Sequence, residues 1–239
     1  MINYTISYSN PHRHYVDFDL TTSTKGLDKM QFQLSAWRPG RYELANFSQN
    51  IQKLAAFDEN NNPLPFKKIT KDLWEVDTNG TMEITVTYNF YANQLDAGAC
   101  YLDEHQLYLN PIHCMFYIVD RMEEDYKIAL DIPKNYKIAS SMELEGNTLS
   151  VKGYDLLAES PLICSDSLQH GTYEVDGITF HLWFQGGCKP DWEKLNKDFS
   201  AFTKSQINNF GGFPVDEYHY FFQITPYRSY HGVEHTKNT

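Results

Sequence analysis

The 239-residue sequence contains no long apolar run, and its first residues lack the pattern of a secretion signal. A membrane-spanning helix needs about 20 consecutive apolar residues, and no segment approaches that length. Residues 1–6 have neither a basic start nor the apolar stretch that precedes a signal cleavage site. We therefore expect no membrane segment and a cytoplasmic location, with a removed signal peptide as the alternative that would leave the same first residues.

Positive charge is also scarce. Lys and Arg number 20 against 31 Asp and Glu, which gives a formal net charge of -11, and no Lys/Arg-rich run offsets this balance locally. Phosphate backbones are bound by clustered basic residues. We therefore expect no nucleic-acid partner.

Closely spaced cysteine pairs are missing as well. Cys100, Cys114, Cys164 and Cys188 lie far apart, and none belongs to a C-x-x-C pair. Four cysteines permit two disulfides, but the wide spacing favours buried reduced thiols.

The zinc-binding motif H-E-x-x-H, which places two imidazoles one helical turn apart, does not occur. His12 and His14 form an H-x-H pair at an expected strand start, but no third ligand is suggested, so we interpret them as surface or turn residues. His231 and His235 are expected in extended backbone, where four residues span roughly 13 Å, too far for one ion. We predict no metal ligand within this chain.

Nucleophilic and carboxylate catalysis find no better support. His113 and Cys114 would point to opposite faces of an expected strand. Residues 165–167, Ser-Asp-Ser, are typical of a turn, and no G-x-S-x-G motif is present. The acidic residues at 103–104 and 123–125 are interpreted as solvated loop charges. We predict no catalytic residue within this chain.

Alternating apolar and polar residues dominate the first 169 positions. The alternation is clear at 14–21, 30–36 and 82–90, and turn-forming residues separate the runs. A period of two with one apolar face is typical of antiparallel strands that cover a core on one side. Asn79-Gly80 between runs 73–77 and 82–90 predicts a hairpin. Residues 1–169 are therefore predicted to form an antiparallel β-sandwich.

The pattern changes near residue 170. Runs 172–175 and 178–184 around Asp176-Gly177 predict a hairpin, and residues 191–210 carry apolar side chains at helical spacing. Those helix positions are Trp192, Leu195, Phe199, Phe202, Ile207 and Phe210. A further strand is expected at 218–224. Strand, strand, helix and strand form an α+β arrangement, so residues 170–239 are predicted to be the incomplete start of a second domain.

Three segments contain sequence motifs in addition to the periodic pattern. They are W-R-P-G-R-Y-E-L at 37–44, Y-D-L-L-A-E-S-P at 154–161, and Y-R-S-Y-H-G-V-E-H at 227–235. Together they resemble the glycyl-aminopeptidase family, whose signatures are W-x-P-G-[ST]-Y, D-x-L-x-[DE]-S-P and Y-G-G-[LM]-E-H. Arg41, His231 and Val233 depart from those patterns. The resemblance extends over essentially the whole chain, with the motifs in the expected order.

The resemblance implies an N-terminal β-sandwich followed by the first part of a thermolysin-like peptidase domain. In such aminopeptidases the glutamate of a G-x-[LM]-E strand binds the free α-amino group of the substrate. Carried over, Glu234 would bind that amine, while Gly232 and Val233 would supply the strand edge; Tyr230 and His235 complete the predicted substrate-binding segment. A carboxylate at the closed end of a cleft is suited to hold an ammonium group.

The resemblance also implies components that this sequence does not contain. A zinc cofactor, the rest of the catalytic domain and a PDZ domain are expected in the full-length parent, together with a peptide substrate. The chain itself is expected to be an N-terminal fragment that holds no cofactor and is inactive alone.

A second hypothesis belongs to another class of protein. The sequence has 17 Tyr and 4 Trp, and such rings can stack on sugars in a non-catalytic β-sandwich that binds carbohydrate or protein. That hypothesis leaves the helix and the G-V-E-H segment unexplained.

Overall fold

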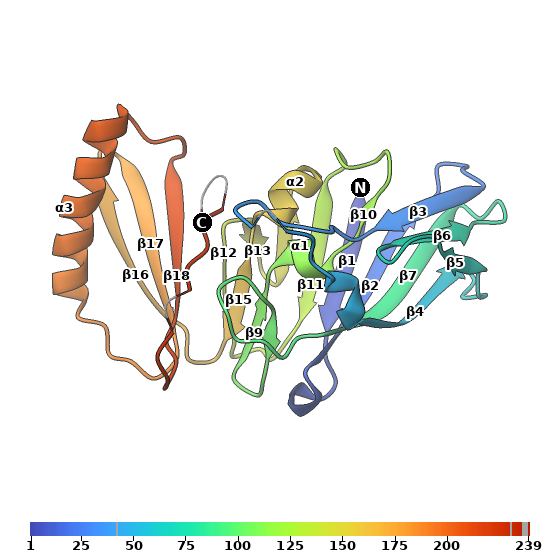
Figure 1. Ribbon diagram of the computed structural model, residues 1–239, viewed down its shortest axis with the longest axis horizontal. Helices are drawn as coiled ribbons and strands as arrows, with labels where there is room; N and C mark the ends of the chain where they lie inside the picture. Colours follow the sequence, from blue (N-terminus) through green and yellow to red (C-terminus); the bar gives the residue numbers. More distant parts are fainter. Residues whose placement is uncertain (42, 230, 236–238) are drawn as a thin grey trace.

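The computed structural model describes residues 1–41, 43–229, 231–235 and 239. Figure 1 shows an elongated molecule, with stacked β-sheets over most of its length and a small sheet covered by one long helix at the end opposite β3 to β6. The protein is mainly β, as the alternating sequence predicts. No helix among the described residues is long and apolar enough to cross a bilayer.

The largest sheet has seven strands in the order β13-β14-β11-β1-β2-β7-β4. All its neighbours are antiparallel except β1 and β11, which run parallel from Ile2 opposite Tyr126 to Ser7 opposite Asp131. The strands are β1 (Ile2–Ser7), β2 (Tyr15–Ser23), β4 (Ile51–Asp58), β7 (Glu83–Tyr91), β11 (Tyr126–Asp131), β13 (Glu143–Glu145) and β14 (Thr148–Val151).

Two four-stranded sheets accompany it. One has the order β10-β3-β6-β5, with β10 (Tyr117–Ile118), β3 (Lys29–Gln33), β6 (Leu73–Asp77) and β5 (Phe66–Lys68). The other has the order β12-β15-β9-β8, with β12 (Lys137–Ser140), β15 (Leu162–Ser165), β9 (Gln106–Leu109) and β8 (Tyr101–Leu102). Short helical turns connect them: η1 (Pro11–Arg13), η2 (Phe47–Asn50), α1 (Pro111–Cys114) and α2 (Gly153–Ala158).

One apolar cluster fills the space between these sheets, and its members come from the buried positions of alternating strands. Along β2, for example, Val16, Phe18 and Leu20 are fully buried while the residues between them are not. The hydroxyl of Tyr4 donates to the Phe116 carbonyl and accepts from the Phe116 N–H, so this buried polar group is satisfied. The period of two predicted for the first 169 residues is therefore confirmed at these strands.

The hairpin predicted at Asn79-Gly80 is wrong. Both residues do adopt the left-handed conformation that tight turns require, with φ of 52° and 77°. However, β6 pairs with β3 and β5, whereas β7 pairs with β2 and β4 in the other sheet. The turn therefore links strands of two packed sheets. A turn motif specifies a local reversal of the chain, but it does not determine whether the strands on its two sides pair with each other.

The small sheet has the order β16-β17-β18, with β16 (Gln169–Val175), β17 (Ile178–Gln185) and β18 (Glu217–Gln223). The hairpin predicted around Asp176-Gly177 is confirmed, with Val175 opposite Ile178. Helix α3 (Trp192–Phe210) connects β17 to the parallel strand β18 and covers one face of the sheet (Figure 1). The division of the chain at residues 169 and 170 stays a prediction.

The ends of α3 lie where the capping residues in the sequence predict them, but its buried face differs in part from the predicted apolar positions. The Asp191 carboxylate caps the helix by accepting from Lys194 N–H, and Gly211 ends it at a φ of 79°. Phe202 and Phe210 are 49% and 83% exposed, so their assignment to the apolar stripe is wrong. Thr203 lies in the stripe instead, buried and hydrogen-bonded to the Tyr173 hydroxyl at 2.9 Å.

Several smaller expectations also need correction. His113 and Cys114 lie in α1 and not on a strand, and the His113 ring stacks on Phe47 at 3.9 Å. His12 lies in η1, and His14 follows it in the left-handed conformation, so neither begins a strand. All four cysteines are free thiols, and three of them are buried, in agreement with the expected reduced state.

Candidate functional site

The W-R-P-G segment forms a tight turn on the sandwich. Arg38 and Arg41 form an isolated antiparallel bridge, in which the Arg41 N–H donates to the Arg38 carbonyl at 3.3 Å. Gly40 has a φ of 79°, a conformation that glycine adopts without strain. A Cβ at Gly40 would lie 3.6 Å from a carboxylate oxygen of Glu234, so the turn lies directly against that carboxylate.

Side-chain contacts before and after Glu234 in the sequence hold the segment of residues 231–235 in place. The Nδ1 of His231 lies 2.5 Å from the Asp96 carboxylate. The Nδ1 of His235 lies 3.6 Å from the Glu159 carboxylate, and both of these side chains are largely buried. Two sandwich segments, one before β8 and one after α2, therefore fix the position of the segment that carries Glu234.

A close approach at Gly98 supports the same arrangement. A Cβ at this position would come within 2.5 Å of the Arg38 guanidinium and 3.3 Å of the His231 ring. The Gly98 N–H donates to the Asp96 carboxylate at 2.8 Å, which keeps the loop against these two side chains. A side chain at position 98 would therefore force the Arg38 guanidinium to move away from the loop.

A small cavity of about 190 Å³, open to solvent on one side, is lined by residues 38–41 and 231–234. A wider groove of about 630 Å³ lies beside it. It is lined mainly by residues 218–225, which belong to β18 and the segment after it, and by residues 231–235. Burial, and after it the charges of Tyr220 and Glu234, raise the pKa of Tyr218 to about 12. Tyr218 therefore stays protonated at neutral pH and can donate a hydrogen bond in the groove.

The structure brings together the three segments that the sequence singled out. Gly232, Val233 and Glu234 share a cavity with the Pro39-Gly40 turn, and the third segment meets the second where His235 faces Glu159. The strand predicted through Gly232 and Val233 is wrong, since residues 231–235 have irregular backbone and pair with no described strand. Tyr230 lies outside the described residues. The roles assigned to these residues stay predictions.

Sequence reasoning missed Asp96. This aspartate lies 135 residues before His231, in a loop that carries no motif, and only the fold places the two side chains together. An Asp-Ala-Gly loop is too common a turn sequence to have marked the position.

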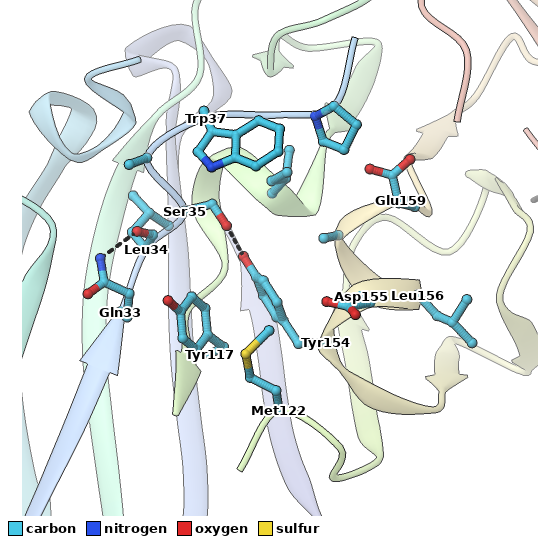
Figure 2. Close-up of a pocket in the computed structure, with 14 residues that line it drawn as sticks. Gln33, Leu34, Ser35, Trp37, Tyr117, Met122, Tyr154, Asp155, Leu156 and Glu159 are labelled. Carbon is cyan, nitrogen blue, oxygen red and sulfur yellow. Dashed lines mark hydrogen bonds between the residues drawn. The ribbon is translucent and has the colours of Figure 1, made fainter. Parts of the chain in front are cut away.

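A second pocket, of about 660 Å³, opens on the sandwich beside α2 (Figure 2). Trp37, Tyr117 and Tyr154 form its aromatic walls, and Asp155 of α2 and Glu159, which follows α2, place carboxylates at its rim. The Tyr154 hydroxyl donates to the Met115 carbonyl, so it accepts from the Ser35 hydroxyl at 3.0 Å, as Figure 2 shows. Aromatic faces with a few polar groups are typical of small-molecule sites.

His231 and His235 do not form a metal site with one another. His231 and His235 face two different carboxylates, Asp96 and Glu159, so their ring nitrogens do not converge on one point. Among the described residues, one set has metal-ligand spacing: His181, Glu217 and His219, whose ligand atoms all lie within 4.8 Å of one another. The sequence analysis did not single out this set, because its members lie on two strands separated by α3.

Comparison with protein families gives one match. The model of the Peptidase M61 N-terminal domain matches residues 3–166. No protein with a curated description matches the chain.

Solved structures share the fold. An aminopeptidase N family protein from Idiomarina loihiensis matches 98% of this chain with a TM-score of 0.92 and 25% sequence identity. An M1 zinc metallopeptidase from Deinococcus radiodurans matches 96% of it with a TM-score of 0.51 and 12% identity, which shows likeness of fold alone. The chain spans 41% of the first of these proteins and 56% of the second.

Proposed function

We propose, from the premise that this chain belongs to the M61 peptidase family and carries its N-terminal domain, that the cavity around Glu234 binds the free amino terminus of a peptide. The observation that carries the proposal is the position of the Glu234 carboxylate, which lies against the Pro39-Gly40 turn and lines a small cavity that is open to solvent. A carboxylate held in such a cavity forms a charge-assisted hydrogen bond with an ammonium group.

The shape of the site supports a peptide as the ligand. The cavity of about 190 Å³ has room for about one amino-acid residue with its free amino group. The adjoining groove of about 630 Å³ follows β18, and it can hold the rest of an extended chain. An amine bound at Glu234 would therefore place the remaining residues of the peptide along the groove.

The hydrolytic step belongs to the proposal for the parent protein. We assign it to a zinc ion bound by residues outside this sequence, since the chain has no H-E-x-x-H and the ring nitrogens of His231 and His235 do not converge. The role of this chain would then be to bind and orient the amino end of the peptide. A PDZ domain in the parent and a cytoplasmic location belong to the same proposal.

Replacing Glu234 with glutamine tests this role. A hydrogen bond to a charged group contributes about 1.5–3 kcal/mol, so the dissociation constant of an unblocked peptide amide should rise roughly 10-fold or more. We would measure it by isothermal titration with the whole chain, using glycyl-peptide amides with a free or an acetylated amino terminus. The wild type should prefer the free amine, and Glu234→Gln should lose that preference.

Glu143→Gln is a matched control, because Glu143 is an exposed glutamate on β13. This variant should bind like the wild type. Equal binding of free and acetylated peptides by the wild type would contradict the proposal, as would an unchanged preference in Glu234→Gln.

A second candidate function is carbohydrate binding at the pocket beside α2. It is favoured by Trp37, which lines this pocket and is 49% exposed, close to carboxylates that can accept from sugar hydroxyls. A glycan array tests it: binding that is lost in Trp37→Ala would support the sandwich as a saccharide module. The absence of any binding glycan would leave peptide binding as the function.

A further inference from the structure

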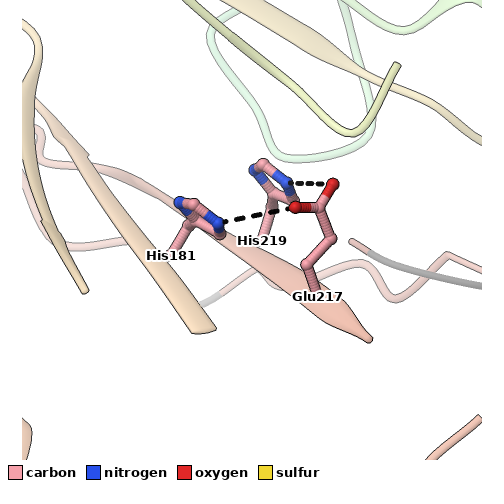
Figure 3. Close-up of side chains that lie close together, drawn as sticks. All are labelled: His181, Glu217 and His219. Carbon is pink, nitrogen blue, oxygen red and sulfur yellow. Dashed lines mark ion pairs between the residues drawn. The ribbon is translucent and has the colours of Figure 1, made fainter. Parts of the chain in front are cut away.

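His181, Glu217 and His219 lie on the face of the small sheet that α3 does not cover. In the parallel pairing of β17 with β18, His181 stands directly opposite His219. Glu217 lies two residues before His219, so its side chain leaves the same face of the strand. Figure 3 shows the carboxylate of Glu217 turned back toward both imidazole rings.

The three side chains meet without forming hydrogen bonds to one another. The two carboxylate oxygens of Glu217 lie 3.8 Å from His181 Nε2 and 3.8 Å from His219 Nε2, beyond hydrogen-bond distance (Figure 3). The side chain of His219 is only 7% exposed, and its Nε2 is buried with no hydrogen-bond partner. A buried polar atom without a partner, directed at a carboxylate, indicates that a further group belongs between them.

The Nδ1 atoms of His181 and His219 already have hydrogen-bond partners. His170 Nε2 lies 3.0 Å from His181 Nδ1, and the Trp183 indole N–H donates to His219 Nδ1 at 3.1 Å. Both Nε2 atoms are therefore the ones turned toward Glu217.

We propose that His181, Glu217 and His219 bind one divalent transition-metal ion of the zinc class. Two imidazole nitrogens and one carboxylate form a donor set that zinc accepts, with a solvent molecule as the fourth ligand. Glu217 is 56% exposed, so its side chain is free to move the short distance needed to close on an ion, and it leaves an entry path from solvent.

The hydrogen bond from Trp183 disfavours metal binding at His219, and this gives the proposal a specific test. An indole N–H only donates, so His219 Nδ1 must accept, and the neutral ring then carries its proton on Nε2. A metal can bind at Nε2 only when this proton has moved to Nδ1, the nitrogen on which a ligand histidine normally carries it, and the Trp183 indole N–H then loses its acceptor. Trp183→Phe removes the indole N–H and lets Nδ1 carry the proton. The affinity should therefore rise about 10-fold, the size of effect typical of groups that orient metal ligands.

The experiment is a calorimetric titration of Zn²⁺ into the whole chain, without an affinity tag and after removal of metal by a chelator. We expect one equivalent to bind. His181→Asn and Glu217→Gln should each lower the affinity by about 10-fold or more, by analogy with changes around other metal sites. Co²⁺ offers a second measurement, because its visible absorption changes when imidazole nitrogens replace water.

His12→Gln is the control, since His12 is an exposed histidine that lies 3.6 Å from another carboxylate, that of Glu104. It should leave Zn²⁺ binding unchanged. Absence of Zn²⁺ binding would overturn the proposal, and so would binding that survives the double variant His181→Asn/Glu217→Gln. An affinity that falls in correctly folded Trp183→Phe would overturn the role of His219. Peptide binding at Glu234 is measured separately, so either result leaves the other open to test.

Discussion

Glu124→Gln should destabilise the protein by roughly 3 kcal/mol, because it breaks a largely buried ion pair from one side only. The Arg121 guanidinium is 7% exposed and donates two hydrogen bonds to the Glu124 carboxylate, at 2.7 and 2.9 Å. It also donates to the Ser23 carbonyl and the Thr22 hydroxyl, both at 2.8 Å. Neutralising Glu124 leaves the positive charge of Arg121 buried without its counter-charge.

The same pair predicts how stability depends on pH. The hydrogen bonds from Arg121, and after them that from Lys25, hold the pKa of Glu124 well below its usual value of 4.5. The pair therefore contributes its full stability above about pH 4.5, and this contribution is lost as the pH falls toward the lowered pKa of the folded state. The variant should lack this part of the acid dependence.

Urea denaturation at pH 7 and pH 3 measures both effects. Glu123→Gln is the control, since it removes the same charge from an exposed neighbouring residue, and its free energy of unfolding should stay within about 0.5 kcal/mol of the wild type. A Glu124→Gln variant as stable as this control would show that the pair contributes nothing at pH 7.

Glu124 also shows where sequence reasoning fails. The run Glu123-Glu124-Asp125 is interpreted from the sequence as solvated charge, and this is wrong for Glu124, whose side chain is 17% exposed. The sequence places Arg121 three residues away, but it does not contain the information that Thr22 and Ser23 close over the guanidinium. Burial of a charged residue depends on contacts between distant segments, and these follow from the fold alone.

The sequence predicted those parts of the fold in which a strand or helix buries one of its faces. Alternation predicts β2, β3 and β7, and helical spacing with an Asp191 cap predicts α3, because burial of one side leaves a periodic trace in the sequence. Strand partners leave no such trace. The Asn79-Gly80 turn therefore suggested a hairpin that does not exist, and the parallel pair β1–β11 was not foreseen.

The candidate site divides in a similar way. Glu234, Gly232 and Val233 were identified by resemblance, and they do lie against the Pro39-Gly40 turn. The partners that hold them in place, Asp96 and Glu159, come from two other segments of the sandwich. Residue types alone cannot reveal such a pairing, because exposed carboxylates are common and only the fold selects these two.

Phe180→Ala should lower the stability of the small sheet and α3 by roughly 3–5 kcal/mol, the usual cost of removing a fully buried aromatic ring. Phe180 has no exposed surface and lies 4.9 Å from the Tyr173 ring and 5.2 Å from the Phe213 ring. Its cluster contains residues of β16 to β18 and α3 and is separate from the cluster that fills the sandwich. If residues 170–239 form a unit of their own, this loss should stay within it.

Phe18→Ala is the matched change in the sandwich, since Phe18 is equally buried and stacks on Tyr88 at 5.0 Å. Amide hydrogen exchange, measured by mass spectrometry on peptic peptides, separates the two regions. We expect Phe180→Ala to speed exchange in β16 to β18 while β2 and β7 keep their protection. Faster exchange throughout the chain would show that sandwich and small sheet unfold together, and the boundary at residue 170 would then be wrong. The apolar contact of Trp183 and Phe221 with Tyr108 and Ile163 is the part of the structure that could couple them.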